Sequence, residues 1–324
     1  MTITSVNTSK MLVHGYGSVE LDPEKVNDDL SLSSEYLQSR LYELLDKKIV
    51  GKLDSNRAVL GIPTAKTFSR TFALPIDKKS SLKDAVNLEV EQYIPMPLEA
   101  LYVDHQIIKQ TKDELTALMC AAPKQMIDPL LEIARSCGLE IAMIEPNMNA
   151  VARLLEHTEE GNLPTVIVDI GPATADIAIL DSAIRVTGGL NVGGNTLTLD
   201  IAKKMNIPLE TAHQLKVLNG LNAGPRQAKI TSSLRPSLIR ISNEVKKVIR
   251  YYTDRFPNEP KIEQILTVGS GSNVPGLGEF FTNELIMPAR IAVPWQTLNF
   301  GELAPPAKQL RPRFMTSAGL ALID

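Results

Sequence analysis

The segment 166–176, VIVDIGPATAD, combines residue types that suit phosphate chemistry. An apolar strand ends in Asp169, Gly171 turns the chain, and Thr174 opens the returning strand. A carboxylate at a strand end can hold the waters of a bound magnesium ion. A glycine turn lets backbone amides approach phosphate oxygens, and a hydroxyl adds a donor. The segment therefore predicts a phosphate-binding turn, with a plain β-hairpin around an Asp–Gly turn as the alternative.

A second glycine turn follows in the segment 265–277, ILTVGSGSNVPGL. The pattern predicts a strand, a flexible turn, and a helix that begins near Val274–Pro275, because proline suits a first helical turn. The close approach allowed by Gly269 and Gly271, with amides at the helix start, could accept a purine ring and a phosphate. The dinucleotide pattern G-x-G-x-x-G and its acidic ribose ligand are missing, so a simple helix-cap loop is the alternative. The two turns in this order are more specific than either alone.

Two features lie between the turns. Gly193 and Gly194 lead into a helix from Asn195. His213 and Lys216 fall one turn apart on another predicted helix. Lys216 could reach a ribose hydroxyl, and a solvated surface lysine is the alternative.

The elements that must position these residues alternate between strands and helices. Predicted strands cover residues 3–7, 11–21, 57–63, 66–74, 102–108, 115–122, 139–144, a strand–turn–strand at 165–180, 183–190 and 264–268. Predicted helices cover 33–48, 81–93, 124–136, 147–157, 195–205, about 209–218, 234–255, 275–285 and 315–322. A Pro-rich linker is expected at 304–312.

Composition limits the classes of protein that fit. A chain of 324 residues suits two domains or several subdomains. A formal net charge of -3 gives no general reason to bind nucleic acid or an acidic membrane surface. No signal core and no apolar run of roughly 18 to 20 residues is visible, which favours the cytoplasm, with the thiols of Cys120 and Cys137 reduced. No Ser/His/Asp, Cys/His or paired-His metal spacing is visible, so no catalytic residue is assigned.

The ordered set of motifs resembles the actin, Hsp70 and FtsA superfamily. Residues 169–171 with Thr174 resemble its second phosphate motif, and residues 269–277 resemble its adenosine motif. The pair Gly193–Gly194 resembles the glycines that open its next helix, and residues 316–321 its connecting helix. The resemblance implies ATP and Mg2+ as cofactors, with Asp169 at the metal. The cofactor-binding residues it implies are Asp169, Gly171, Thr174, Gly193, Gly194, Lys216, Gly269, Ser270, Gly271, Ser272 and Pro275.

The resemblance also implies the architecture: an α/β actin-like ATPase fold of two RNase H-like domains, with an inserted FtsA/PilM-type α/β subdomain. The two glycine turns are expected to meet at a crevice between the domains, which ATP would close. Domain 1 is expected at 1–64 and 139–160, with the inserted subdomain at 65–138. Domain 2 is expected at 161–312, with a small subdomain at about 197–257, and residues 313–324 form the connecting helix back to domain 1.

A narrower match is the segment 91–97, EQYIPMP, which resembles the signature of the type IV pilus assembly family PilM. FtsA usually continues into a membrane-binding amphipathic helix, and no such segment is visible here, which favours PilM. The family implies an adaptor at the inner face of the cytoplasmic membrane, without direct membrane insertion. It implies binding of the N-terminal cytoplasmic tail of a PilN-like membrane protein beside residues 65–137, together with other proteins of the pilus inner-membrane complex.

Three departures from the superfamily pattern modify this interpretation. Its first D-x-G hairpin is not found, and residues 3–7 resemble the second strand of that hairpin. We therefore expect a sequence shortened at its N-terminus by about twenty residues, one strand and its turn. His213 stands where a glutamate is common, and Asn147 where an acidic residue is common. Both changes weaken hydrolysis more than binding, so we expect at most a slow ATPase, with the nucleotide as a conformational ligand.

Three other function classes compete. A polymerising cytoskeletal or cell-division protein of the FtsA kind would pellet with ATP. A sugar or acetate kinase of the same superfold would release phosphate only with a small hydroxylated substrate. An Hsp70-type chaperone would need a substrate domain that is not visible in the sequence.

Overall fold

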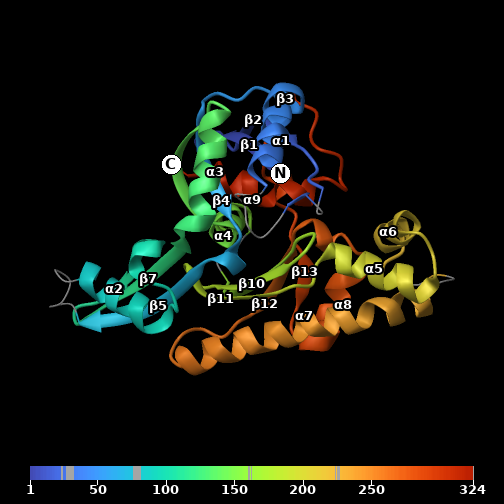
Figure 1. Ribbon diagram of the computed structural model, residues 1–324. Helices are drawn as coiled ribbons and strands as arrows, with labels where there is room; N and C mark the ends of the chain where they lie inside the picture. The colour runs from blue at the N-terminus through green and yellow to red at the C-terminus, as the bar shows by residue number, and fades with distance from the viewer. Residues whose placement is uncertain are drawn as a thin grey trace. The chain divides into compact units, whose positions relative to one another are not determined.

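The computed structural model describes residues 1–22, 25–26, 33–75, 82–159, 161, 163–222, 224 and 227–323. The chain divides into two compact units (Figure 1). Unit 1 comprises residues 1–150, 298–305 and 316–324, and unit 2 comprises residues 151–297 and 306–315. None of the helices in the described part of the chain has the length and hydropathy needed to span a bilayer.

The described residues of unit 1 form three small sheets. The strands β1 (Thr2–Asn7), β2 (Leu12–Ser18) and β3 (Ile49–Gly51) pair antiparallel in that order. The strands β4 (Arg57–Ile62) and β8 (Glu140–Pro146) pair in parallel, as expected for strands joined by a long crossover. The helices α1 (Ser34–Lys47) and α3 (Lys124–Ser136) pack against each other.

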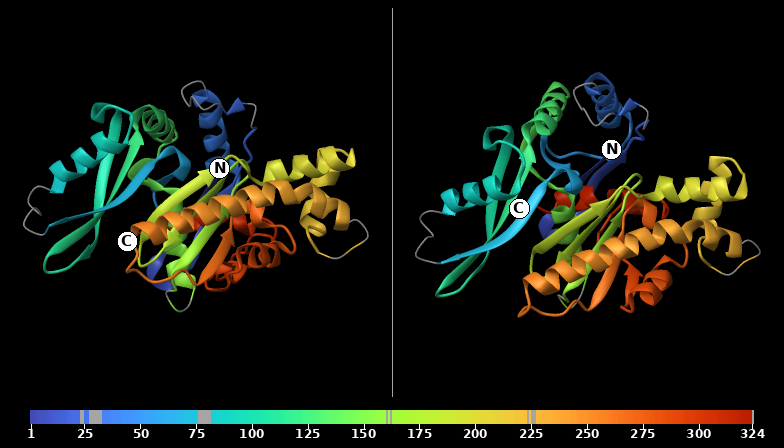
Figure 2. Two further views of the ribbon diagram at one scale, coloured as in Figure 1. Left: turned by 90° about the horizontal axis from the view of Figure 1, so that it is seen from below. Right: turned by 60° about the horizontal axis from the view of Figure 1, so that its bottom comes forward.

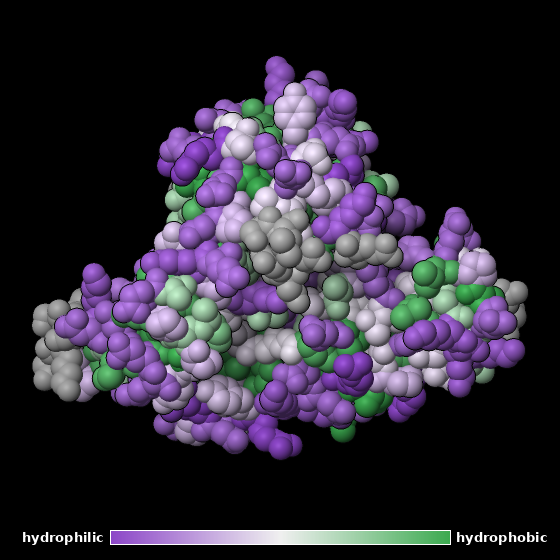
Figure 3. All heavy atoms as spheres, in the orientation of Figure 1, coloured by the Kyte–Doolittle hydropathy of each residue, from purple (hydrophilic) through white to green (hydrophobic). Residues whose placement is uncertain are grey.

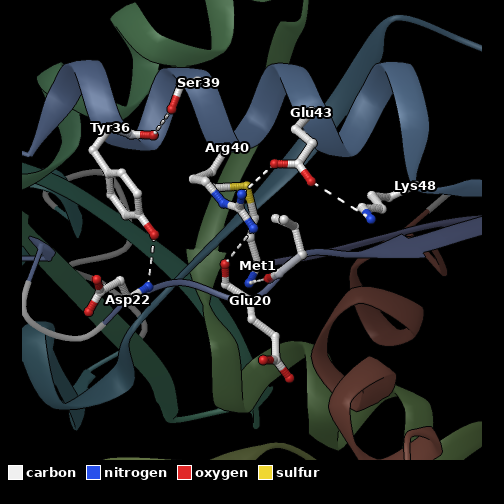
Figure 4. A network of polar contacts seen from close by, with 9 residues as sticks. Met1, Glu20, Asp22, Tyr36, Ser39, Arg40, Glu43 and Lys48 are labelled. Atoms are coloured by element: carbon white, nitrogen blue, oxygen red, sulfur yellow. Dashed lines mark hydrogen bonds and ion pairs between the residues drawn. The ribbon is translucent and has the colours of Figure 1, made fainter.

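Polar contacts from α1 hold the chain segment that follows β2 (Figure 4). The Tyr36 hydroxyl accepts the backbone amide of Asp22 at 2.8 Å, and the Arg40 guanidinium donates to the Glu20 carbonyl at 2.9 Å. Arg40 also pairs with Glu43 one turn along the helix. Because two of these bonds satisfy backbone groups, they fix the path of the chain more than an exposed ion pair would.

The inserted subdomain has a sheet and a core of its own. Its strands β5 (Phe68–Pro75), β7 (Glu114–Pro123) and β6 (Leu101–Gln110) form an antiparallel sheet with β7 at the centre. The helix α2 (Leu82–Tyr93) contributes Val86 and Val90, which are buried against that sheet. The strands predicted at 102–108 and 115–122 are confirmed; they pair antiparallel, and both are longer than predicted.

The connecting helix α9 (Met315–Leu320) contacts the first turn of α4 (Asn147–Thr158) within unit 1. A Cβ on Gly319 would overlap the carbonyl of Ala150, so only glycine allows this backbone contact. Within the small-residue segment 316–321, Gly319 is therefore a packing requirement. From Val151 onward, α4 belongs to unit 2.

Unit 2 is built on a five-stranded mixed sheet in the order β11-β10-β9-β12-β13. Its strands are β9 (Thr165–Ile170), β10 (Ala175–Leu180), β11 (Ile184–Leu190), β12 (Gln264–Val268) and β13 (Ala289–Ile291). β9, β10 and β11 form an antiparallel meander, and β12 runs parallel to both β9 and β13.

Alternate residues of β9 and β10 face a core that helices cover. Val166, Val168 and Ile177 are fully buried there, against α5 (Gly194–Met205) and the long α7 (Gln227–Arg255). Figure 2 shows α7 running across this face of the sheet. The smaller helices of unit 2 are α6 (Leu209–Leu218) and α8 (Leu277–Leu285).

Two predicted helix starts are wrong. α7 begins at Gln227, seven residues before the predicted start at 234 (234 − 227), and contains Pro236. Burial of residues such as Ile230 stabilises these additional turns, and the helix continues through Pro236. α8 begins at Leu277, not near Val274–Pro275, because the Pro275 carbonyl accepts the amide of Leu221 at 2.7 Å and Gly276 turns the chain with φ +80°.

Candidate functional site

The two glycine turns lie together, and both belong to unit 2. They follow the carboxyl ends of the adjacent parallel strands β9 and β12, where Val268 pairs with Asp169. Gly269 has φ +85°, and a Cβ there would overlap Oδ1 of Asp169 and lie 2.6 Å from the Ile170 carbonyl oxygen. The second turn therefore touches the first through backbone atoms, and only glycine fits at the contact.

The glycine pair before α5 joins the same cluster. A Cβ on Gly271 would lie 2.8 Å from the Gly171 carbonyl oxygen, and one on Gly194 would lie 3.0 Å from Cα of Gly271. A Cβ on Gly193 would lie 2.7 Å from the Gly171 carbonyl oxygen. The structure thus brings Gly171, Gly193, Gly194, Gly269 and Gly271 into one cluster, here called the glycine cluster. Its surface is mostly backbone, which suits the close approach of a phosphate.

Part of the hydrogen-bonding capacity of the cluster is used internally. The amide of Gly194 donates to the Gly171 carbonyl at 2.9 Å, and the amide of Asn195 donates to the Pro172 carbonyl at 2.8 Å. Pro172 itself has no N–H. The turn therefore has fewer free donors than an all-glycine turn would offer.

Two aspartates face each other at the first turn. Asp169 and Asp176 are cross-strand partners in β9 and β10, so both side chains project from the same face of the hairpin. Burial raises the pKa of Asp169 to about 7, with a further contribution from the charge of Asp176. Burial raises the pKa of Asp176 to about 6. The prediction did not include Asp176, although its position opposite Asp169 was visible in the sequence.

This pair has the chemistry of a cation site. Within the described residues, Oδ1 of Asp176 is buried without a hydrogen-bond partner. The described residues contain no group of three or more acidic, His or Cys side chains placed for a metal ion. Mg2+ in nucleotide sites is commonly held by only one or two carboxylates, with water and phosphate oxygens completing its shell. Asp169 and Asp176 therefore fit a magnesium–nucleotide complex better than a metal ion alone.

Lys216 is buried, so its interpretation as a solvated surface lysine is wrong. Its side chain is 4% exposed, and Nζ donates to the Gly194 carbonyl at 2.8 Å. Burial lowers its pKa to about 8. Lys216 places a positive charge against the glycine cluster, where an anion would be stabilised.

The remaining predicted residues have different roles. Ser272 is fully buried, and its hydroxyl donates to the Gly269 carbonyl at 2.7 Å within a 3-10 turn (Ser270–Ser272). Pro275 holds the loop at Leu221. Thr174 and Ser270 are partly exposed beside the cluster. Ligand contact for all the predicted residues stays a prediction.

The model of the family described as "Type IV pilus assembly protein PilM" matches residues 5–324. A solved structure entitled "PilM-PilN type IV pilus biogenesis complex" is 20% identical, with a TM-score of 0.82 over 99% of this chain and 94% of that chain. This agreement confirms the mixed α/β, actin-like fold.

Curated relatives match shorter segments. The cell division protein FtsA of Neisseria meningitidis serogroup B is 28% identical over 207 residues, 57% of this chain and 48% of that protein. FtsA of Borreliella burgdorferi is 24% identical over 51% of this chain and 43% of that protein. The matched part thus spans about half the length of these relatives or less. The PilM model, in contrast, covers nearly the whole sequence, and the chain belongs to the family of the type IV pilus assembly protein PilM.

Proposed function

We propose that this chain is an adaptor of the type IV pilus assembly machinery that links the cytoplasm to an inner-membrane partner. The observation that carries the proposal is the PilM family match over residues 5–324. The structure of similar fold is entitled as a complex of PilM with PilN. By this proposal the chain binds the N-terminal cytoplasmic tail of a PilN-like protein. It then lies at the inner face of the membrane through that partner, together with other proteins of the pilus complex.

The nucleotide half of the proposal rests on the glycine cluster. The cluster offers a backbone surface, the buried Lys216 and the acidic pair Asp169–Asp176. Bound there, ATP with Mg2+ would have its charge balanced by Lys216 and the metal ion. Because Pro172 removes one amide donor and others are used internally, we propose binding with little or no turnover.

The proposed binding of the PilN-like tail is supported by exposed apolar side chains of the inserted subdomain. Four large apolar side chains are exposed there: Leu88 and Tyr93 of α2, and Tyr102 and Ile107 of β6. Figure 3 shows apolar residues among hydrophilic ones over the part that carries α2 and β5. β5 and β6 are the two edges of their sheet, and an extended peptide can pair with such an edge.

Tyr93 belongs to the segment EQYIPMP, and its exposed ring is stacked against a neighbouring side chain. The Arg70 guanidinium lies 3.2 Å from the centre of the Tyr93 ring, and Nε of Arg70 lies 3.1 Å from Oε2 of Glu89. A cation stacked on the ring restricts its rotamers, which lowers the entropy cost of binding. We propose that the tail docks against Tyr93 and Leu88.

A pull-down tests this proposal directly. The immobilised N-terminal tail peptide of the neighbouring PilN-like protein should retain the full chain, and Tyr93→Ala should reduce retention at least tenfold. Tyr251→Ala is the matched control, since Tyr251 and Tyr93 are both 50% exposed on helices. Failure of the peptide to retain the full chain, or equal losses in the two variants, would contradict the proposal.

A further inference from the structure

Two strands of unit 1 have an edge that pairs with no other strand of the described residues. β1 is the outer strand of its sheet, and β4 pairs only with β8. Within the described residues, no other backbone hydrogen bond joins residues 2–7 or 57–62 to a further strand. Each free edge therefore carries a row of unpaired backbone N–H and C=O groups. A parallel pair is normally part of a larger sheet, so the isolated pair β4–β8 is unusual.

The sheet of unit 2 shows which element fits between two such edges. There, β9 lies between the hairpin β10–β11 and the parallel pair β12–β13, antiparallel to β10 and parallel to β12. Unit 1 repeats the flanking parts in the same chain order, as the hairpin β1–β2, the helix α1 and the parallel pair β4–β8. Among the described residues, unit 1 has no strand that corresponds to β9.

The helix α9 contacts both free edges. Oγ1 of Thr4 in β1 lies 2.7 Å from Oγ of Ser317, and a Cβ on Gly61 in β4 would lie 3.4 Å from Cγ2 of Thr316. Because Thr316 and Ser317 are consecutive residues, β1 and β4 run beside the same turn of α9. An intervening strand would hold its two neighbours about 10 Å apart, twice the spacing of paired strands. Side-chain contacts from adjacent helix positions are compatible with that separation.

The side chains beside these edges are less buried than their counterparts in unit 2. Ile177 of β10 and Ile265 of β12, which flank β9, are fully buried. Ile3 of β1 and Val59 and Leu60 of β4 are only partly buried. This difference is expected where a neighbouring strand is missing, and it leaves apolar surface accessible beside β1 and β4.

Helices cover both faces of the position between β1 and β4. Ile3 pairs with Gly17 of β2, and a Cβ on Gly17 would lie 3.1 Å from Cδ1 of Leu44 in α1. Thr4 is adjacent to Ile3 in the strand and faces the opposite side, where it contacts Ser317 of α9. A strand with helices on both faces has to be apolar on both faces.

β9 defines the chemistry of a segment that would fit. It has six residues with the sequence TVIVDI, and four of them are fully buried: Val166, Ile167, Val168 and Ile170. Because these residues include neighbours in the strand, both faces of β9 are apolar. A matching segment for unit 1 is therefore extended, about as long as β9, and rich in β-branched residues.

We propose that the position between β1 and β4 binds one extended, apolar segment of a protein partner, parallel to β4 and antiparallel to β1. The described strands of this chain, and hence those of a second copy, are already paired on at least one edge and cannot pair on both. Residues 27–32 and 76–81 lie outside the described residues, and their sequences, NDDLSL and IDKKSS, are too polar for a strand that is apolar on both faces. The position lies outside the glycine cluster and the inserted subdomain, so this contact does not rest on the proposed function.

Amide hydrogen exchange of the full chain, followed by NMR, tests the proposal. The probe is the β9 sequence TVIVDI, with lysines added at both ends for solubility. In the free chain, the unpaired amides of β1 and β4 should exchange about tenfold or more faster than those of β9 and β12. Saturating probe should slow exchange in β1 and β4 together. The amides of β6, an edge strand of the inserted subdomain, should exchange at an unchanged rate.

N-methylated probes show whether one or two edges are used. Alternate amides of a central strand point to opposite neighbours, so methylation of the valine pair and the last isoleucine removes the donors along one edge. Methylation of the first isoleucine and the aspartate removes donors along the other edge. Each modified probe should bind about tenfold more weakly or worse, because each loses several hydrogen bonds. A probe methylated only at its lysines is the matched control and should bind unchanged.

Four outcomes would overturn the proposal. If β1 and β4 in the free chain exchange as slowly as β9 and β12, the position is closed. Protection of only one of the two strands, or full binding by one of the two methylated probes, would indicate addition to a single edge. Protection of β6 in place of β1 and β4 would assign the probe to the inserted subdomain. Protection that rises with protein concentration alone would assign the position to a second copy of the chain.

Discussion

Gly269→Ala is the sharpest test of the contact between the two glycine turns. Its Cβ would overlap Oδ1 of Asp169 and lie 2.6 Å from the Ile170 carbonyl oxygen, in a backbone conformation with φ +85°. Gly138 is the matched control, because it has φ +80° but no atom within 4 Å of the position that a Cβ would occupy. The two substitutions therefore share the backbone cost and differ in the steric cost.

The magnitudes follow from these two costs. A left-handed conformation costs a residue with a Cβ about 1–2 kcal/mol. Overpacking a tight site adds about 1–3 kcal/mol. Gly138→Ala should thus lower the free energy of unfolding of its unit by about 1–2 kcal/mol, and Gly269→Ala should lower that of unit 2 by about 2–5 kcal/mol. At about 2–4 °C per kcal/mol, the melting temperature of unit 2 should fall on the order of 10 °C in Gly269→Ala.

Differential scanning calorimetry of the full chain is the appropriate assay, because the two units can unfold in separate transitions. Gly269→Ala should shift one transition strongly, and Gly138→Ala should shift a transition only slightly. Equal shifts in the two variants would refute the close approach of the turns, and with it the glycine cluster.

Three further predictions concern the charged residues beside the glycine cluster. Burial raises the folded-state pKa values of Asp169 and Asp176 from 3.8 to about 7 and about 6, so folding favours their protonated forms. The contribution of this pair to the stability of the unliganded chain should therefore be highest below about pH 4 and should be lost as the pH rises through 6 to 7. Urea unfolding between pH 5 and 8 should show this loss, and Asp176→Asn should reduce it; an unchanged pH slope in the variant would contradict the assignment. Lys216→Met removes the donor to the Gly194 carbonyl and should lower the free energy of unfolding by about 1–3 kcal/mol, which chemical denaturation can measure; a change within error would mean that this bond is not formed. A steady-state phosphate-release assay with ATP and Mg2+ should detect at most slow turnover, whereas robust turnover that Asp169→Ala abolishes would show that the chain is an ATPase.

The sequence predicted most of the fold, because strand and helix periodicity is a local property. α3 and α6 have the predicted bounds, as does β12. The start of α7 was missed by seven residues, although the additional first turns contain the buried residues Ile230 and Ser233 and the helix continues through Pro236.

The candidate site was predictable only in part. The glycines were found because tight turns require them, and the structure brings them together. The burial of Lys216 depends on the packing of α6 against α5, which no local pattern encodes. The internal role of Ser272 depends likewise on the fold of the second turn. Asp176 could have been found, since a hairpin places it directly opposite Asp169.

Membrane flotation tests the adaptor function most directly. The full chain would be mixed with liposomes that contain the full-length PilN-like protein, the same protein without its N-terminal tail, or no protein. We predict that the chain floats only with liposomes that contain the intact partner. Flotation with empty liposomes, equal flotation with the tail-deleted partner, or no flotation with the intact partner would contradict the adaptor function.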